Sequence, residues 1–236
     1  MTLATTTTTS SQPRTKSHGS DALLYHADPD FCSLVSSPRR CPLWGDARYR
    51  GNCDGTLFKE LVHRYRPASV ADPMVGSGTT RDVITGMAQY GQYRGRYWSA
   101  DLRSGFDLVE TPLPGRYEMV WIHPPYWDII RYSDHPADLS GISDFRAFLG
   151  SLAACLRRCR ESLVQGGMLA VLIGDVRRRG RYYCLAQHVM QLDGDIGDLS
   201  SVIIKAQHNC TSDRIRYAAM KHPPIKHEYC LLFANR

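Results

Sequence analysis

The chain has 236 residues, which is enough for one well-packed α/β domain and short for two. Its hydrophobic content of 43% is ordinary for a globular protein, and no apolar run approaches the ~20 residues that a membrane helix needs. A net charge of +6 at pH 7 fits a polyanionic partner, but does not separate nucleic-acid binding from a merely basic surface.

The eight cysteines form neither a Cys-x-x-Cys pair nor paired clusters of the kind that bind zinc. Cys155 and Cys159 fall on the apolar face of an expected helix, and Cys230 falls in an expected strand. This pattern favours buried, reduced thiols, which are typical of a cytoplasmic protein. We therefore predict no metal site.

The first 20 residues are rich in Thr and Ser and contain no acidic residue. Such a segment buries too little apolar area to offset the entropy of ordering it, so a disordered tail is expected over 1–20. The remainder, 21–236, is interpreted as one domain.

The first half of the domain alternates helical and strand patterns. Leu57, Leu61 and Tyr65 share one helical stripe. The predicted helices cover 56–66 and 81–90, and the predicted strands cover 69–75, 96–102, 106–109 and 118–122.

In the second half, an apolar stripe predicts a long helix over 143–164, capped by Ser143 and ended by Gly166 and Gly167. The continuous apolar run 168–173 is typical of a strand that is covered on both faces. A short helix over 183–191 and strands over 200–205 and 228–233 follow. The alternation predicts a doubly wound, mostly parallel sheet in which the last two strands form an antiparallel pair at one edge.

One strand is expected to break into a glycine turn that opens a helix, in the segment Ala71-Asp72-Pro73-Met74-Val75-Gly76-Ser77-Gly78-Thr79-Thr80. Such a turn presents backbone N–H groups and the positive end of a helix dipole to a ligand. Asp72 ends this strand, and Asp101 ends the next one, where an acid can accept two ribose hydroxyls. The glycines do not form the Gly-x-Gly-x-x-Gly fingerprint, which argues against a nicotinamide cofactor.

A second motif, His123-Pro124-Pro125-Tyr126, follows the strand predicted over 118–122. Two prolines stiffen the loop and remove competing N–H donors. Tyr126 offers an aromatic face on which a base can stack.

In this order the two motifs resemble the S-adenosylmethionine-dependent DNA methyltransferases that act on exocyclic amino groups. Their first motif commonly reads Asp-Pro-Phe-x-Gly-Ser-Gly-Thr-Thr, and their second reads Asp, Asn or Ser followed by Pro-Pro-Tyr. The resemblance covers roughly residues 45–236 and implies a Rossmann-like methyltransferase fold with S-adenosylmethionine as cofactor. It also implies target-base residues at His123, Pro124, Pro125 and Tyr126, and cofactor residues at Asp72, Gly76, Gly78, Thr79, Asp101, Asp107 and Asn52.

His123 departs from the family pattern. A neutral imidazole has one acceptor nitrogen for an amino hydrogen, whereas an imidazolium has none. We therefore expect activity to fall as the pH drops below roughly 6.5.

The resemblance implies DNA as the partner, with the target adenine or cytosine flipped out of a duplex or already single-stranded. A homodimer or a partner subunit is a further expectation, because no insert is long enough for a large target-recognition domain. RNA or protein-amide methylation, and a non-catalytic nucleic-acid-binding module, stay open as alternatives. The basic residues that could contact phosphates are Arg177, Arg178, Arg179, Arg181, Lys205, Arg214, Arg216, Lys221 and Lys226.

Overall fold

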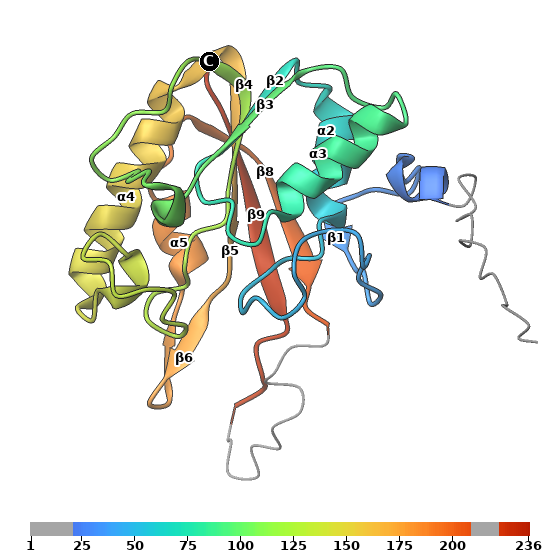
Figure 1. The fold of residues 1–236 in the computed structure, drawn as a ribbon. Coiled ribbons are helices and arrows are strands. Elements are labelled where there is room, and N and C mark those ends of the chain that lie inside the picture. Colours follow the sequence, from blue (N-terminus) through green and yellow to red (C-terminus); the bar gives the residue numbers. More distant parts are fainter. Residues whose placement is uncertain (1–20, 209–221) are drawn as a thin grey trace, which may run out of the picture.

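The computed structural model describes residues 21–208 and 222–236. The expectations for the tail 1–20 and for Arg214, Arg216 and Lys221 lie outside the described residues. A seven-stranded sheet in the order β1-β8-β9-β5-β4-β2-β3 forms the centre of the molecule (Figure 1). Its strands are β1 (Leu34–Val35), β2 (Ser69–Asp72), β3 (Arg96–Ser99), β4 (Tyr117–Ile122), β5 (Leu163–Ile173), β8 (Asp198–Ala206) and β9 (His227–Ala234).

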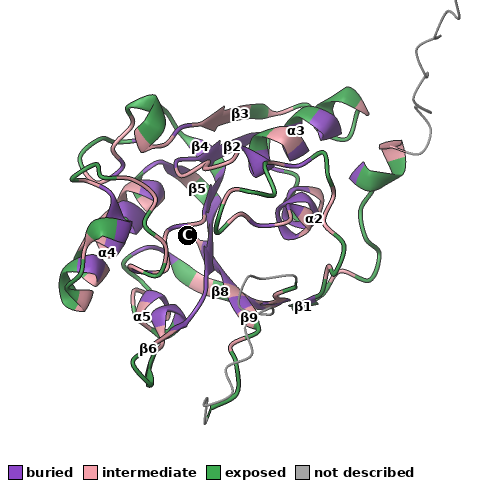
Figure 2. Ribbon diagram, turned by 60° about the horizontal axis from the view of Figure 1, so that its bottom comes forward, coloured by how far each residue is buried: buried purple, intermediate pink, exposed green. Residues whose placement is uncertain are grey.

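Helices cover both faces of this sheet. Helices α4 and α5 lie on one face, and α2 and α3 lie on the other (Figures 1 and 2). Strand β9 is antiparallel to both β5 and β8, while the other neighbours in the sheet run parallel. The predicted doubly wound, Rossmann-like sheet with antiparallel strands toward one edge is therefore confirmed. The helices are α2 (Thr56–Tyr65), α3 (Thr79–Gln89), α4 (Phe145–Glu161) and α5 (Leu185–Met190).

Strand β4 illustrates why the central strands are apolar throughout. Its side chains alternate between the faces, as the two-residue period of a strand requires. Val120 and Ile122 pack into the core beneath α4, whereas Met119 and Trp121 pack into the core on the α2 side. All four are buried, which is the pattern of a sheet covered on both faces.

The long helix differs from its prediction at both ends. Asp144 rather than Ser143 is the N-cap, since its carboxylate accepts the Ala147 N–H at 2.7 Å. The helix ends at Glu161, and Leu163 already pairs with β4. Gly167 therefore lies inside β5, where a Cβ would come within 2.9 Å of the Val164 carbonyl oxygen.

The prediction of a strand over 106–109 is wrong, because this segment forms turns instead. The Asp107 side chain accepts the Val109 N–H at 2.9 Å, and the Asp107 carbonyl accepts the Thr111 N–H at 2.7 Å. These local bonds compete with strand pairing and leave β3 at the edge of the sheet.

Two features were not predicted. Strand β1 pairs with β8, so the antiparallel pair β8–β9 is not the outermost part of the sheet. A small hairpin of β6 (Val176–Arg178) and β7 (Arg181–Tyr183) projects from the same end as the loop after β4 (Figure 1). Within residues 21–208 and 222–236, no helix has the length and apolar character that crossing a membrane requires.

Candidate active site

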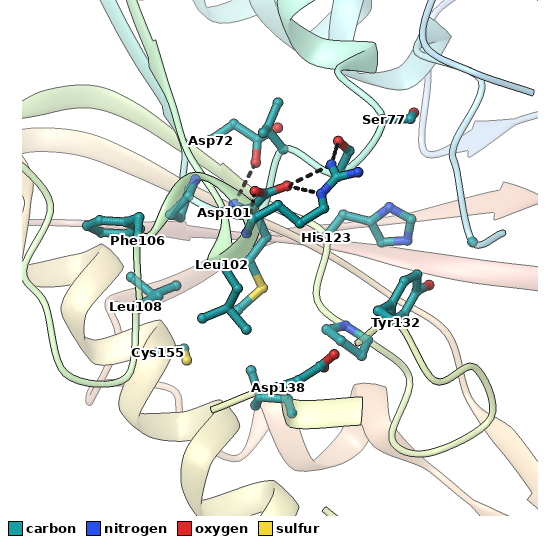
Figure 3. A pocket seen from close by; sticks show the side chains of 18 of the residues that line it. Asp72, Ser77, Asp101, Leu102, Phe106, Leu108, His123, Tyr132, Asp138 and Cys155 are labelled. Carbon is teal, nitrogen blue, oxygen red and sulfur yellow. Dashed lines mark hydrogen bonds and ion pairs between the residues drawn. The ribbon is translucent and has the colours of Figure 1, made fainter. Parts of the chain in front are cut away.

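A cavity of about 240 Å³ opens at the carboxyl ends of β2, β3 and β4. The chain leaves β2 toward β3 and returns on the other side of β2 as β4, so the cavity lies where the strand order reverses. Open α/β sheets bind ligands at this position. Both sequence motifs supply its lining: the glycine turn after β2, and His123 and Pro125 after β4 (Figure 3).

Asp72 ends β2 and faces the cavity, although only 2% of the residue is exposed. Its carboxylate accepts the Met74 N–H at 3.1 Å and the hydroxyl of Thr80. Burial raises the pKa of Asp72 to about 7, against the lowering effect of these two hydrogen bonds. The carboxyl group is thus held rigidly and is ready to ionise beside a cation.

The glycine turn adopts backbone angles that favour glycine. Gly76 has φ +52° and Gly78 has φ +88°, in the left-handed region. Gly78 is the N-cap of α3, and a Cβ there would come within 2.2 Å of the Arg81 guanidinium. The turn therefore brings the N-terminus of α3 to the cavity, as the sequence predicted.

Asp101 follows β3 and also lines the cavity. Its carboxylate caps the short 3-10 helix η2 (Leu102–Ser104) by accepting the backbone N–H groups of Arg103 and Ser104. The Arg103 guanidinium pairs with the same carboxylate at 2.8 Å and also donates to the Gly76 carbonyl. Arg103 therefore spans the space between the ends of β2 and β3.

Asn52 and Thr79 meet at the wall of the cavity, 27 positions apart in sequence. The Thr79 hydroxyl donates to the Asn52 side-chain oxygen, and the Asn52 amide donates to the Asp46 carbonyl at 2.7 Å. These bonds fasten the segment before α2 to the first turn of α3.

The opposite wall is mainly apolar. Phe106 and Leu108 line it together with Cys155 of α4. Asp107 also lines the cavity, between these two apolar residues, and its carboxylate already accepts one backbone N–H. This wall suits a flat, apolar group with a polar edge.

His123 stands directly after β4 and lines the cavity. Its Nε2 lies 2.9 Å from the Tyr126 hydroxyl. Burial is the main influence that lowers the pKa of His123; Glu228 opposes it and Lys205 adds to it. The imidazole is therefore neutral at physiological pH.

His123 and Pro125 line the cavity, whereas Tyr126 does not. Its ring packs so closely on Gly174 that a Cβ there would come within 2.5 Å of it. Its hydroxyl donates to Glu228 Oε1 at 2.9 Å. The next residue, Trp127, has φ +55°, a strained backbone conformation of the kind that gathers at functional sites.

Several lining residues were not predicted from the sequence. Tyr49 and Tyr132 stack with ring centroids 5.7 Å apart, and the Arg103 guanidinium lies 5.2 Å from the Tyr49 ring centroid. Asp138 is buried and accepts hydrogen bonds from Ser133 and Ser140. These residues come from loops, and no sequence period places loop side chains.

Among residues 21–208 and 222–236, no group of three or more His, Cys, Asp or Glu is arranged to hold a metal ion.

Comparison with known proteins gave structural matches only. No family model and no curated protein matches the chain. TTHA0409 from Thermus thermophilus, provisionally described as a DNA modification methylase and complexed with S-adenosyl-L-methionine, is 28% identical over 54% of this chain and 51% of its own, with a TM-score of 0.38. N-methyltransferase NodS from Bradyrhizobium japonicum, in complex with S-adenosyl-L-homocysteine, is 9% identical over 72% of this chain and 78% of its own, with a TM-score of 0.39.

The chain thus spans about half the length of TTHA0409. TTHA0409 contains S-adenosyl-L-methionine in this structure, and NodS contains S-adenosyl-L-homocysteine.

Proposed function

We propose that this protein is an S-adenosylmethionine-dependent methyltransferase that methylates the exocyclic amino group of adenine or cytosine in DNA. The observation that carries the proposal is the meeting of the glycine turn and the His-Pro-Pro-Tyr loop at one cavity, at the point of sheet reversal. Two motifs about 45 residues apart in sequence thereby supply a cofactor side and a target side.

On the cofactor side, the two strand-end acids have distinct tasks. Asp72 receives the methionine ammonium, and Asp101 accepts the two ribose hydroxyls. The apolar wall with Asp107 holds the adenine, whose amino group donates to the Asp107 carboxylate. Gly76 lets the backbone of the turn approach the cofactor, while Gly78 shapes the turn by donating its N–H to the Val75 carbonyl at 2.9 Å. Asn52 and Thr79 fix the wall at the methionine end of the cofactor.

On the target side, an aromatic amine needs an acceptor for its hydrogens, because its lone pair is conjugated with the ring. Nδ1 of neutral His123 is that acceptor. The amine nitrogen forms the new N–C bond, the C–S bond breaks, and its electron pair stays on sulfur. The amino proton passes to Nδ1 and then to water, so that S-adenosylhomocysteine and the methylated base remain. Positioning of the amine in line with the C–S bond supplies much of the rate.

The β6–β7 hairpin supports a nucleic-acid partner. Arg179 and Arg181 are exposed at its tip, and Tyr182 is 41% exposed beside them. Arg178 fixes the hairpin to the target loop through an ion pair with Asp128. Phosphate-binding cations thus stand next to the loop that would hold the base.

The test is to incubate the protein with methyl-labelled cofactor and unmethylated DNA, RNA or protein extract, and to identify the product by digestion and mass spectrometry. Methyladenine or methylcytosine in DNA is the expected result. Label confined to RNA or to glutamine would move the substrate to another class. Bound cofactor without any transfer would favour a non-catalytic nucleic-acid-binding module.

A further inference from the structure

A chain of polar groups connects His123, which follows β4, to Glu228 on β9 and Lys205 on β8. The Tyr126 hydroxyl lies 2.9 Å from His123 Nε2 and 2.9 Å from Glu228 Oε1. Glu228 Oε2 lies 3.1 Å from Lys205 Nζ, and Lys205 lies 3.1 Å from Asp54 Oδ2. Glu228 and Lys205 are register partners on β9 and β8, and they are only 7% and 6% exposed.

The chemistry of these groups fixes the direction of each hydrogen bond. A carboxylate only accepts, so the Tyr126 hydroxyl donates its single proton to Glu228. The tyrosine oxygen can then only accept from His123, so Nε2 carries a proton. A neutral imidazole carries one ring N–H, which leaves Nδ1 as a bare acceptor.

Glu228 is ionised in this setting. Burial by itself raises the pKa of Glu228, but Lys205, His123, Gln207 and Tyr126 together hold that pKa below its usual value. Gln207 adds a hydrogen bond to Glu228 Oε1 at 2.9 Å.

We propose that Glu228 is a positioning residue that acts through Tyr126 to hold His123 in the Nε2–H tautomer, so that Nδ1 faces the substrate amine. The proposal rests on the proposed function for the identity of the substrate. The tautomer itself is a property of the free protein.

The charge of Glu228 also favours uptake of a proton by His123. Asp54, Glu228 and Lys205 together carry a net charge of −1, and the negative end contacts His123 through Tyr126. When Nδ1 takes the amino proton, the new imidazolium is stabilised by this charge. Buried ion pairs add little net stability, so the buried pair of Lys205 and Glu228 fits a role in the site.

The experiment uses the full chain labelled with 15N-histidine, with the His123 signals assigned from His123→Asn. In the wild type we expect an unprotonated Nδ1 and a slowly exchanging Nε2–H. Tyr126→Phe removes the acceptor, so that the Nε2–H exchanges at least tenfold faster. Glu228→Gln removes the charge and shifts the titration of His123 to lower pH, since Glu228 raises its pKa.

Asp175→Asn is the matched control, because Asp175 is a buried acid that also accepts a tyrosine hydroxyl, that of Tyr182 at 2.7 Å. It should leave the His123 signals unchanged. A proton on Nδ1 in the wild type, or an unchanged exchange rate in Tyr126→Phe, would overturn the inference. Neither measurement needs a substrate, so the inference can fail while DNA methylation is observed, and the reverse.

Discussion

The Arg103 guanidinium lies 2.8 Å from Asp101 Oδ2 and bonds the Gly76 carbonyl at the same time. It therefore lies across the place proposed for the cofactor ribose. The Arg103 side chain is 57% exposed, and exposed ion pairs contribute little to stability. Arg103 can thus leave Asp101 at small cost when the ribose hydroxyls arrive.

Replacing Arg103 by Ala should tighten S-adenosylmethionine binding about two- to fivefold, because the cofactor then no longer competes with the guanidinium for Asp101. Isothermal titration calorimetry measures this directly. Arg157, on α4, forms a comparably exposed pair with Asp195, so Arg157→Ala should leave the affinity unchanged. Weaker binding in Arg103→Ala would instead make Arg103 a cofactor ligand.

Replacing Asp101 by Ala should abolish cofactor binding. Two hydrogen bonds from hydroxyls to a charged group are lost, which corresponds to roughly a 100-fold or larger drop in affinity. Because Asp101 also caps η2, Asp101→Asn serves as a second variant that keeps the side-chain size and one acceptor oxygen. Full affinity in both variants would refute the ribose assignment.

Cofactor binding should depend on the ionisation of Asp72. Its pKa of about 7 in the free protein means that a proton must leave before the ammonium can bind. We expect affinity to fall about tenfold per pH unit below pH 7. Asp72→Asn should bind weakly at every pH in this range; an equal slope in that variant would assign the titration to another group.

Ionisation of Asp72 favours cofactor binding but destabilises the fold of the free protein. Its pKa is raised above the unfolded value of 3.8, so its contribution favours folding at low pH and is lost as the pH rises through about 7. At pH 8, Asp72→Asn should therefore raise the melting temperature of the free protein. The gain in free energy of unfolding has an upper limit of roughly 4 kcal/mol. Below pH 4 the difference should vanish. Equal melting temperatures at pH 8 would mean that Asp72 is not destabilised by burial.

Side chains that directly follow a strand could be placed from the sequence. The carboxyl ends of parallel strands meet at one edge of a sheet, so locating β2 and β4 was enough to bring Asp72 and His123 to one cavity. The cap of α4 was misplaced by one residue, because Ser143 and Asp144 are both good N-caps.

Contacts between residues that are far apart in sequence could not be predicted, because they depend on how the strands pair. Tyr126 and Glu228 are 102 positions apart, and only the register of β9 against its neighbours brings them together. The β6–β7 hairpin did leave a signal in the sequence, because Gly180 suits a two-residue hairpin turn with positive φ. In the structure Arg179 and Gly180 form this turn, with φ +48° and +77°. From the sequence alone, the arginines of this segment are predicted only as residues that could contact phosphates.

The methylation rate should fall in acid because only neutral His123 accepts an amino hydrogen. Burial lowers the pKa of His123 below 6.5, so the inflection should lie below that value rather than at it. Measuring kcat at saturating cofactor separates this effect from the Asp72 titration. His123→Asn supplies an acceptor that does not titrate and should lose the inflection. The same profile in both proteins would remove His123 from the acceptor role.

Reversing charge at the hairpin tip should weaken DNA binding. In Arg179→Glu combined with Arg181→Glu, two phosphate contacts are lost, so affinity should fall tenfold or more, and the slope of log K against log salt concentration should decrease by about 1.4 for a single strand. Fluorescence anisotropy with a single-stranded oligonucleotide at two salt concentrations measures both quantities. Arg94→Glu with Arg116→Glu makes the same change in net charge just before β3 and β4, at the end of the sheet opposite the cavity. If both double variants lose affinity equally, DNA responds to the overall charge of the protein, and the hairpin is not its contact.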